Sequence, residues 1–189
     1  MQDISDIISD ASKVLLEEES SYLMVKEKCE EIIRVCGRAM QLMHAGRADD
    51  ANKMLEGIKP QVLGMQGSSN SLVLVAQQEY AEAQLLLHML GNQPLPHYKD
   101  LGVPPEAYLL GLLDALGEAR REIIEHMRKD DYETATRLFE VMSSTYELLL
   151  PLRFSNSILP GFRRKLDVAR SLVEQCRRDL LMFKISKGL

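Results

Sequence analysis

The chain has 189 residues, of which 46% are hydrophobic and 27% charged, and a formal net charge of −5. This composition excludes an intrinsically disordered chain, and the length fits a single domain over residues 1–189 with a substantial core. Uninterrupted apolar runs stay well below the ~18 residues of a membrane-spanning helix. The acidic N-terminus is unlike a signal peptide, so we expect a cytoplasmic protein.

Long proline-free stretches predict an all-α fold, a bundle of about six to seven helices that begins with a long one. Apolar residues follow steps of four and three from Ile4 to Met43, which is the period of a long packed helix. A shorter helix is expected from Asp49 to about Met65, broken or kinked at Pro60. The other predicted helices cover about 72–90, about 105–128, the segment between Asp130 and Pro151, with Asp130 in a capping box, and a last stretch that includes 162–183.

Two predicted helices carry carboxylates inside apolar stripes, where an ionised group is costly without a partner. Glu79 and Glu82 are three residues apart on one helix, and Asp114 and Glu118 lie on the next, beside small residues that would permit close packing. Antiparallel packing of the two helices would bring the four carboxylates together, and cations would then be needed to keep them ionised. All-oxygen ligands suit Mg²⁺ or Mn²⁺. The same pattern also fits carboxylates with a structural role alone.

Other candidate groups are interpreted as ordinary. The additional Glu-x-x-Glu pairs, Glu27/Glu30 and Glu122/Glu125, are expected to be solvated. No histidine follows a glutamate at the spacing of a ferritin-type di-iron site, so the histidines are taken as surface or core residues. The three cysteines fall in core stripes and are expected to be buried, inert thiols.

Basic residues are unevenly distributed along the chain. From Pro151 onward nine Lys and Arg residues accompany three acids. Such a cluster can follow a phosphate backbone, or it can form a solvated helix face paired with acids elsewhere. Further candidates for binding nucleic acid are Arg34, Arg38, Arg120 and Arg121.

Segments 78–83 (QEYAEA) and 103–118 (VPPEAYLLGLLDALGE) resemble the translin family, in particular its translin-associated factor X branch and archaeal relatives. The resemblance implies an all-α bundle that assembles into shells of about eight subunits and binds single-stranded RNA or DNA. It also implies a Mg²⁺-dependent endoribonuclease site. Arg121 matches a basic position of the family, whereas segment 67–71 lacks the basic or histidine residues that often precede the third helix. The four acids of the family's site correspond to Glu79, Glu82, Asp114 and Glu118.

The primary hypothesis is therefore a metal-dependent endoribonuclease that cleaves single-stranded or unpaired RNA inside a homo-oligomer, an octamer by the resemblance. In this hypothesis Mg²⁺ or Mn²⁺ activates water. A non-catalytic module that binds single-stranded nucleic acid is the first alternative. An all-α nucleoside triphosphate pyrophosphohydrolase is the second, since that class also uses Glu-x-x-Glu and a further acidic pair. A helical adaptor without a nucleic-acid role is the third.

Overall fold

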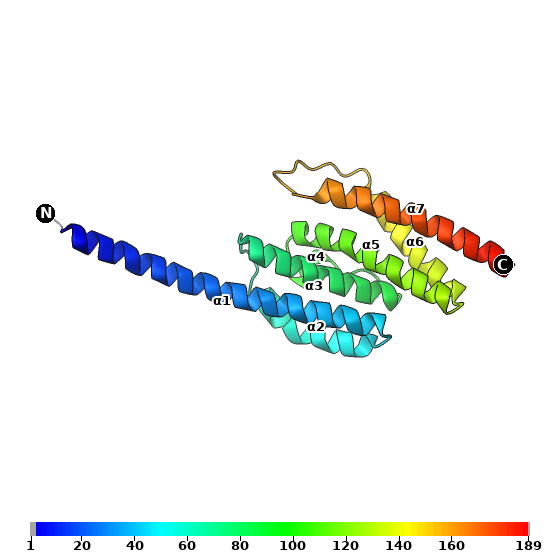
Figure 1. The fold of residues 1–189 in the computed structure, drawn as a ribbon, viewed down its shortest axis with the longest axis horizontal. Helices are drawn as coiled ribbons and strands as arrows, with labels where there is room; N and C mark the ends of the chain where they lie inside the picture. Colours follow the sequence, from blue (N-terminus) through cyan, green and yellow to red (C-terminus); the bar gives the residue numbers. More distant parts are fainter. Residues whose placement is uncertain (1–2, 189) are drawn as a thin grey trace.

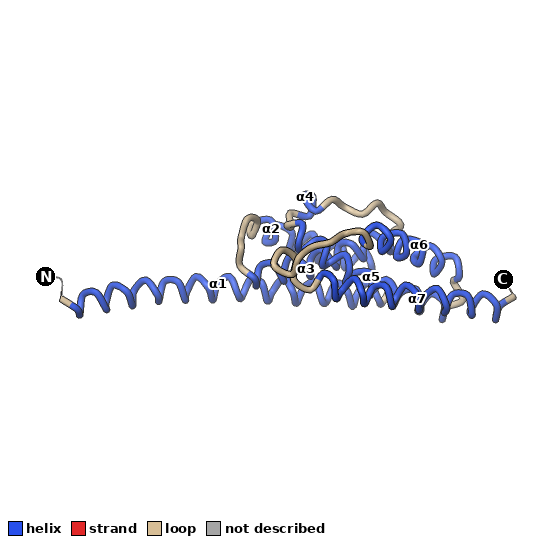
Figure 2. Tube along the Cα trace, turned by 90° about the horizontal axis from the view of Figure 1, so that it is seen from above, coloured by secondary structure: helices blue, strands red, loops and turns tan. Residues whose placement is uncertain are grey.

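The computed structural model describes residues 3–188, which form helices and loops without any strand (Figure 2). The predicted all-α fold is thus confirmed. No helix within these residues has the length and apolar character needed to cross a membrane. Along the chain the helices are α1 (Ile4–His44), α2 (Ala48–Leu63), α3 (Ser71–Leu90), α4 (Tyr98–Leu101), α5 (Pro105–Arg128), α6 (Tyr132–Leu149) and α7 (Phe162–Lys187).

Helices α3 and α5 form the centre of the bundle (Figure 1). Helices α1 and α2 cover one side of this pair, and α6 and α7 cover the other. Tyr80 and Leu86 of α3 are fully buried, as are Leu116 and Ile123 of α5. Each such apolar side chain contributes about 1.5–3 kcal/mol by leaving water. The side chains of the central pair are therefore held rigidly by packing on both sides.

Helix α1 is covered by the bundle over its C-terminal part only. Its buried residues begin at Cys29 and end at Met43, whereas Ile4 is 72% exposed and Leu15 is 63% exposed. The N-terminal part projects beyond the other helices as a straight extension (Figures 1 and 2). The predicted apolar seam therefore exists along the whole helix, but its first half has no partner among residues 3–188.

Two predicted local features differ in the structure. Helix α2 is not broken at Pro60 but continues to Leu63, although the proline lacks the N–H that would donate to the carbonyl four residues earlier. The cap of α6 is Asp131, whose side chain accepts a hydrogen bond from the Thr134 amide, and not Asp130. The short helix α4 was not predicted.

Helices α3 and α5 run in the same direction, so the expected antiparallel packing is also wrong (Figure 1). The connecting segment 91–104 returns along α3 before α5 begins. Its 14 residues are enough, since extended chain spans up to ~3.3 Å per residue and α3 rises ~1.5 Å per residue. A Cβ at Gly111 would lie 2.7 Å from the Gln78 carbonyl oxygen and 3.0 Å from the Glu82 amide nitrogen. The two helices therefore approach closely at Gly111. A Cβ at Gly117 would make only an ordinary van der Waals contact, at 3.9 Å from Leu172.

Candidate active site

An open hollow between α3, α5 and α7 holds all four predicted carboxylates. Its volume is ≈ 450 Å³. Glu79 and Glu82 reach it from α3, and Asp114 and Glu118 reach it from α5, with each side chain half-buried. Parallel packing places both pairs at the same height, because Gly111 lets the start of α5 rest against the α3 backbone beside Glu82.

Burial and repulsion by neighbouring charges disfavour the ionised forms of Glu79 and Glu82. The pKa of Glu82 is raised to about 8, chiefly by desolvation and further by the charges of Asp114, Glu79 and Glu118. The pKa of Glu79 is raised by burial and by Asp114, and the charge of Lys165 opposes this shift. With a pKa of about 8, Glu82 carries a proton near neutral pH unless additional positive charge enters the hollow.

One positive charge is already supplied by α7. The ammonium group of Lys165 forms an ion pair with Asp114. Gln78 donates a hydrogen bond of 2.8 Å from Nε2 to the other carboxylate oxygen of Asp114. Both oxygens of this carboxylate thus have partners, and Lys165 is a site residue that was not predicted.

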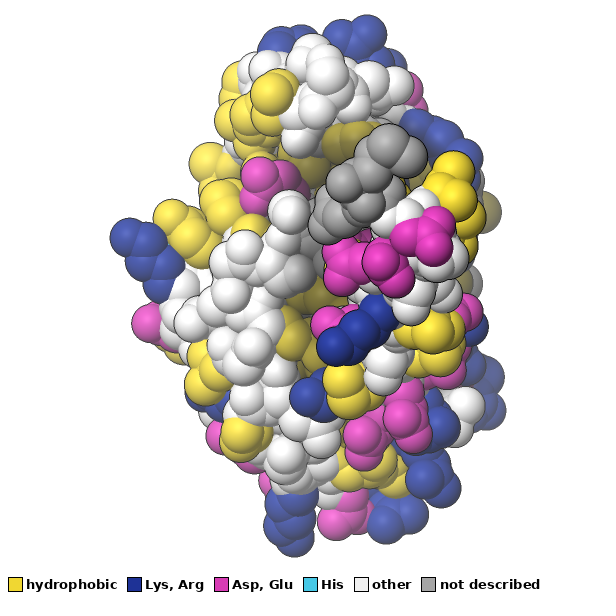
Figure 3. Space-filling model, turned by 90° about the vertical axis from the view of Figure 1, so that its left-hand side faces the viewer, with side chains coloured by type: hydrophobic (Ala, Val, Ile, Leu, Met, Phe, Trp, Pro, Cys, Tyr) yellow, Lys and Arg dark blue, Asp and Glu magenta, His cyan; other side chains and the backbone are white. Residues whose placement is uncertain are grey.

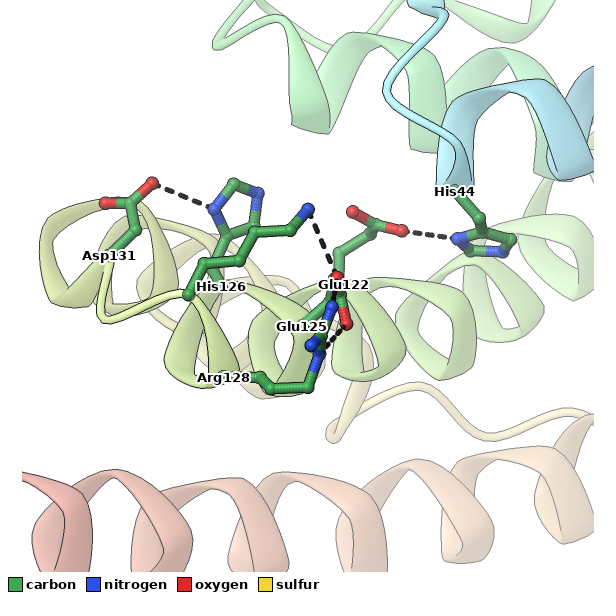
Figure 4. Close-up of polar contacts among 7 residues, drawn as sticks. His44, Glu122, Glu125, His126, Arg128 and Asp131 are labelled. Carbon is green, nitrogen blue, oxygen red and sulfur yellow. Dashed lines mark hydrogen bonds and ion pairs between the residues drawn. The ribbon is translucent and has the colours of Figure 1, made fainter.

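His44 of α1 contacts two carboxylates of α5, those of Glu118 and Glu122. Its Nε2 lies 2.6 Å from Glu118 Oε2. Its Nδ1 contacts Glu122 (Figure 4), so one ring bridges two carboxylates. Glu122 is buried, and the prediction that it is solvated is wrong. His44, predicted to be an ordinary surface or core histidine, lies half-buried between the two carboxylates. Asp114, Glu118 and Glu122 are spaced by four residues, so they share one face of the helix.

The four arginines proposed for phosphate binding differ in their surroundings. Arg120 forms a 3.2 Å ion pair with Asp179 of α7, which gives it a structural partner. Arg121 is exposed, and its Nη1 lies 3.9 Å from Glu118 Oε2 at the rim of the hollow. Arg34 and Arg38 are exposed on α1 and do not line the hollow.

The donor chemistry of the hollow fits a hard divalent cation, since its acidic walls offer oxygen atoms alone. Within residues 3–188, no three His, Cys, Asp or Glu side chains already converge as a ready metal site. The Lys165 ammonium group supplies beside Asp114 the positive charge that a metal ion would otherwise supply. The carboxylates would therefore have to turn toward a shared ion, and Lys165 would have to move away from Asp114.

Thiol chemistry has no support in this structure. Cys29, Cys36 and Cys176 are buried and free, as predicted. Burial raises the pKa of Cys36 to about 12 and that of Cys176 to about 11. Thiols with such pKa values are not nucleophiles near neutral pH.

Comparisons with known proteins agree with one another. The model of the Translin family matches residues 61–186. The chain is 29% identical over 167 residues to an uncharacterized protein of Methanocaldococcus jannaschii, a match that covers 81% of this chain and 72% of that protein.

Among solved structures, AfC3PO in a complex with duplex RNA is similar over 95% of this chain and 97% of its own, with 27% identity and a TM-score of 0.85. A crystal structure of AfC3PO is 28% identical, with a match that covers 96% of this chain and 99% of that chain and a TM-score of 0.78. Apo-NeC3PO has 21% identity and a TM-score of 0.78 over 97% of this chain and 98% of its own, which is a likeness of fold.

Proposed function

We propose that this chain, which belongs to the translin family, is a metal-dependent endoribonuclease of the factor X-like branch. The observation that supports this most strongly is the meeting of four carboxylates in one hollow, with the pKa of Glu82 raised to about 8. Such a group of acids is stable in its ionised form when a cation neutralises it.

Glu79, Glu82, Asp114 and Glu118 would hold one or two Mg²⁺ or Mn²⁺ ions. Such an ion, when bound, supplies a water molecule of lowered pKa and positive charge beside the scissile phosphate. Two residues of the chain have further roles at this site. Glu82 would release its proton when a cation enters the hollow, because burial and neighbouring negative charges raise its pKa. His44 fixes the orientation of Glu118.

Positive side chains at the hollow are suited to bind phosphate oxygens. Lys165 would exchange its contact with Asp114 for one with the phosphate, and exposed Arg121 would bind the phosphate from the rim. AfC3PO was solved with duplex RNA, which supports RNA as the polymer class. We propose single-stranded or unpaired RNA as the substrate, with single-stranded DNA as a second ligand, and the cytoplasm as the location.

The uncovered part of α1 supports self-association. Exposed apolar side chains such as Ile4, Ile8 and Leu15 lie on one projecting helix, and large exposed apolar surfaces mark contacts between proteins. We propose a closed homo-oligomer of about eight subunits, as the family resemblance implies. Light scattering coupled to size exclusion would measure its mass, and a monomer at micromolar concentration would contradict it.

A non-catalytic role in binding nucleic acid is the second candidate. It is favoured by the ion pair between Lys165 and Asp114, which neutralises one acid without metal. The pyrophosphohydrolase alternative depends on acid spacing alone, and family membership gives it no support.

A cleavage assay separates these functions. Labelled single-stranded and duplex RNA, and a nucleoside triphosphate, are incubated with the protein in Mg²⁺, Mn²⁺ or EDTA. We expect metal-dependent cutting of RNA that is lost in Glu82→Gln and kept in Glu27→Gln, an exposed glutamate of α1. RNA that is bound but uncut under every condition would establish the non-catalytic role. Hydrolysis of the triphosphate would instead favour the pyrophosphohydrolase hypothesis.

A further inference from the structure

We propose that the loop between α6 and α7, together with the first turns of α7, binds a single-stranded RNA segment next to the acidic hollow. Arg163 and Arg170 would contact its phosphates, and the ring of Phe154 would stack on a base. The inference deepens the proposed function and rests on it, because it assigns the path of the strand that enters the acidic site.

The first observation is a series of adjoining hollows. One, of ≈ 270 Å³, is lined by Arg153, Phe154, Arg163 and Arg170 among others. A second, of ≈ 610 Å³, shares Phe154 and Arg163 with the first and adds Arg164. Arg164 also lines the acidic hollow. The recessed surface therefore leads from the four carboxylates along the start of α7 to the loop.

The second observation is that the arginines along this path have no ion-pair partner within residues 3–188. Arg163, Arg164 and Arg170 are exposed, and within residues 3–188 no carboxylate oxygen forms an ion pair with them. Arg120, by contrast, is paired with Asp179 at 3.2 Å.

Charge also accumulates along this stretch of sequence. Segment 150–170 contains five basic residues and one acid, Asp167, which gives 5 − 1 = +4. Unpaired arginines gathered along a groove attract a chain of phosphates. Figure 3 looks along α1 at the end of the bundle where this loop turns, and shows lysine and arginine side chains gathered at the top of the molecule beside apolar ones.

The third observation is a supported aromatic ring. Phe154 is 36% exposed, and its ring meets buried Phe162 edge to face, with centroids 5.3 Å apart. The guanidinium group of Arg153 donates a 2.9 Å hydrogen bond to the carbonyl oxygen of Leu152, which holds this side chain against the backbone beside the ring. An exposed ring next to unpaired arginines is the combination that binds single strands, since bases stack on the ring and phosphates reach the arginines. Paired bases in a duplex are not free to stack in this way.

Binding is measured by fluorescence anisotropy in EDTA, so that cleavage does not occur. The probes are a labelled single-stranded RNA of about 15 nucleotides and the matching duplex. For Arg163→Ala/Arg170→Ala we expect a dissociation constant raised about 10-fold at about 0.1 M salt, with a salt slope reduced by about 1 to 2. The matched control is Lys53→Ala/Lys59→Ala, which removes equal charge from α2 on the opposite side of the bundle.

Phe154→Ala tests the stacking separately from the charge. We expect binding of the single strand to weaken about 5- to 50-fold, with no change for the duplex, and Phe154→Leu to retain the defect. Unchanged single-strand binding in Phe154→Ala, or an equal loss in the α2 control, would overturn the assigned path and leave the proposed function standing. Failure of the wild-type protein to bind either RNA would instead overturn the proposed function itself.

Discussion

The acidic hollow and the basic surface at the start of α7 are neighbours, but their charges are held in opposite ways. Asp114 and Glu118 are half-buried and have partners from α7 and α1, respectively. Arg163 and Arg170 are exposed and have no ion-pair partner within the described residues. A partly buried charge must be fixed by its neighbours. An exposed and unpaired one is available to a ligand. Substitutions in the first region should therefore change stability, whereas those in the second should change binding alone.

The largest effect is expected where the two acid-bearing helices touch. Gly111→Leu would place side-chain atoms against the Gln78 carbonyl and the Glu82 amide, which are backbone atoms that cannot turn away. We expect a loss of roughly 3 kcal/mol of unfolding free energy, measured by urea denaturation. Gly117→Ala is the control, since its Cβ would lie 3.9 Å from Leu172 and should cost little. Equal stability of both variants would disprove the close contact between α3 and α5.

Removal of the ring that bridges two carboxylates should come second. His44→Ala would leave buried Glu122 without its partner, a loss of about 2 kcal/mol. The comparable variant His126→Ala breaks a 2.9 Å contact with the more exposed Asp131 (Figure 4) and should cost less than about 1 kcal/mol. Thermal melts of the two variants at neutral pH provide the comparison. A smaller loss for His44→Ala than for His126→Ala would contradict the bridging role.

Stability should also depend on pH through Glu82. Its pKa is about 8 in the folded chain and near the ordinary value of 4.5 in the unfolded one, so the folded state binds more protons between these values. Stability should therefore fall as pH rises from about 5 to 8, by up to about 1 kcal/mol per pH unit. Glu82→Gln should flatten this slope. Mg²⁺ should raise the melting temperature of the wild-type protein at pH 8 more than that of Glu82→Gln. A slope unchanged by the substitution would show that Glu82 is not the titrating group.

The smallest effect on stability should come from the basic surface. Arg163→Ala/Arg170→Ala removes exposed side chains without ion pairs, so the unfolding free energy should change by less than about 0.5 kcal/mol. Urea denaturation of this variant completes the comparison with the acidic region. A loss of stability as large as that of His44→Ala would show that these arginines serve the fold.

Some of this site was predictable from periodicity, and some of it was not. Glu79 and Glu82 interrupt an apolar stripe of one helix, which is a local signal. The partners of the acids are not local. His44 is in the last turn of α1 and Lys165 in the first turns of α7, so their contacts depend on how helices distant in sequence are arranged. Glu122 could have been recognised, because it continues the four-residue spacing of Asp114 and Glu118.

The direction of packing was less predictable still. The sequence of segment 91–104 shows turn residues but does not show that the chain returns along α3 before α5 begins. Pro60 misled the prediction for α2, because a proline inside a helix removes one hydrogen bond but does not always end the helix. The two acid pairs nevertheless meet, since Gly111 brings the helices together at the height of Glu82.

The projecting part of α1 should make the helix content of the protein depend on its concentration. Apart from half-buried Val25, the residues from Ile4 to Lys28 are exposed, and a helix without tertiary contacts is marginally stable in water. If subunits cover this segment, dilution should melt it while the bundle stays folded. The circular dichroism signal at about 222 nm should then decrease with dilution before the bundle itself unfolds. The helicity of the first part of α1 would then indicate whether the subunits are assembled.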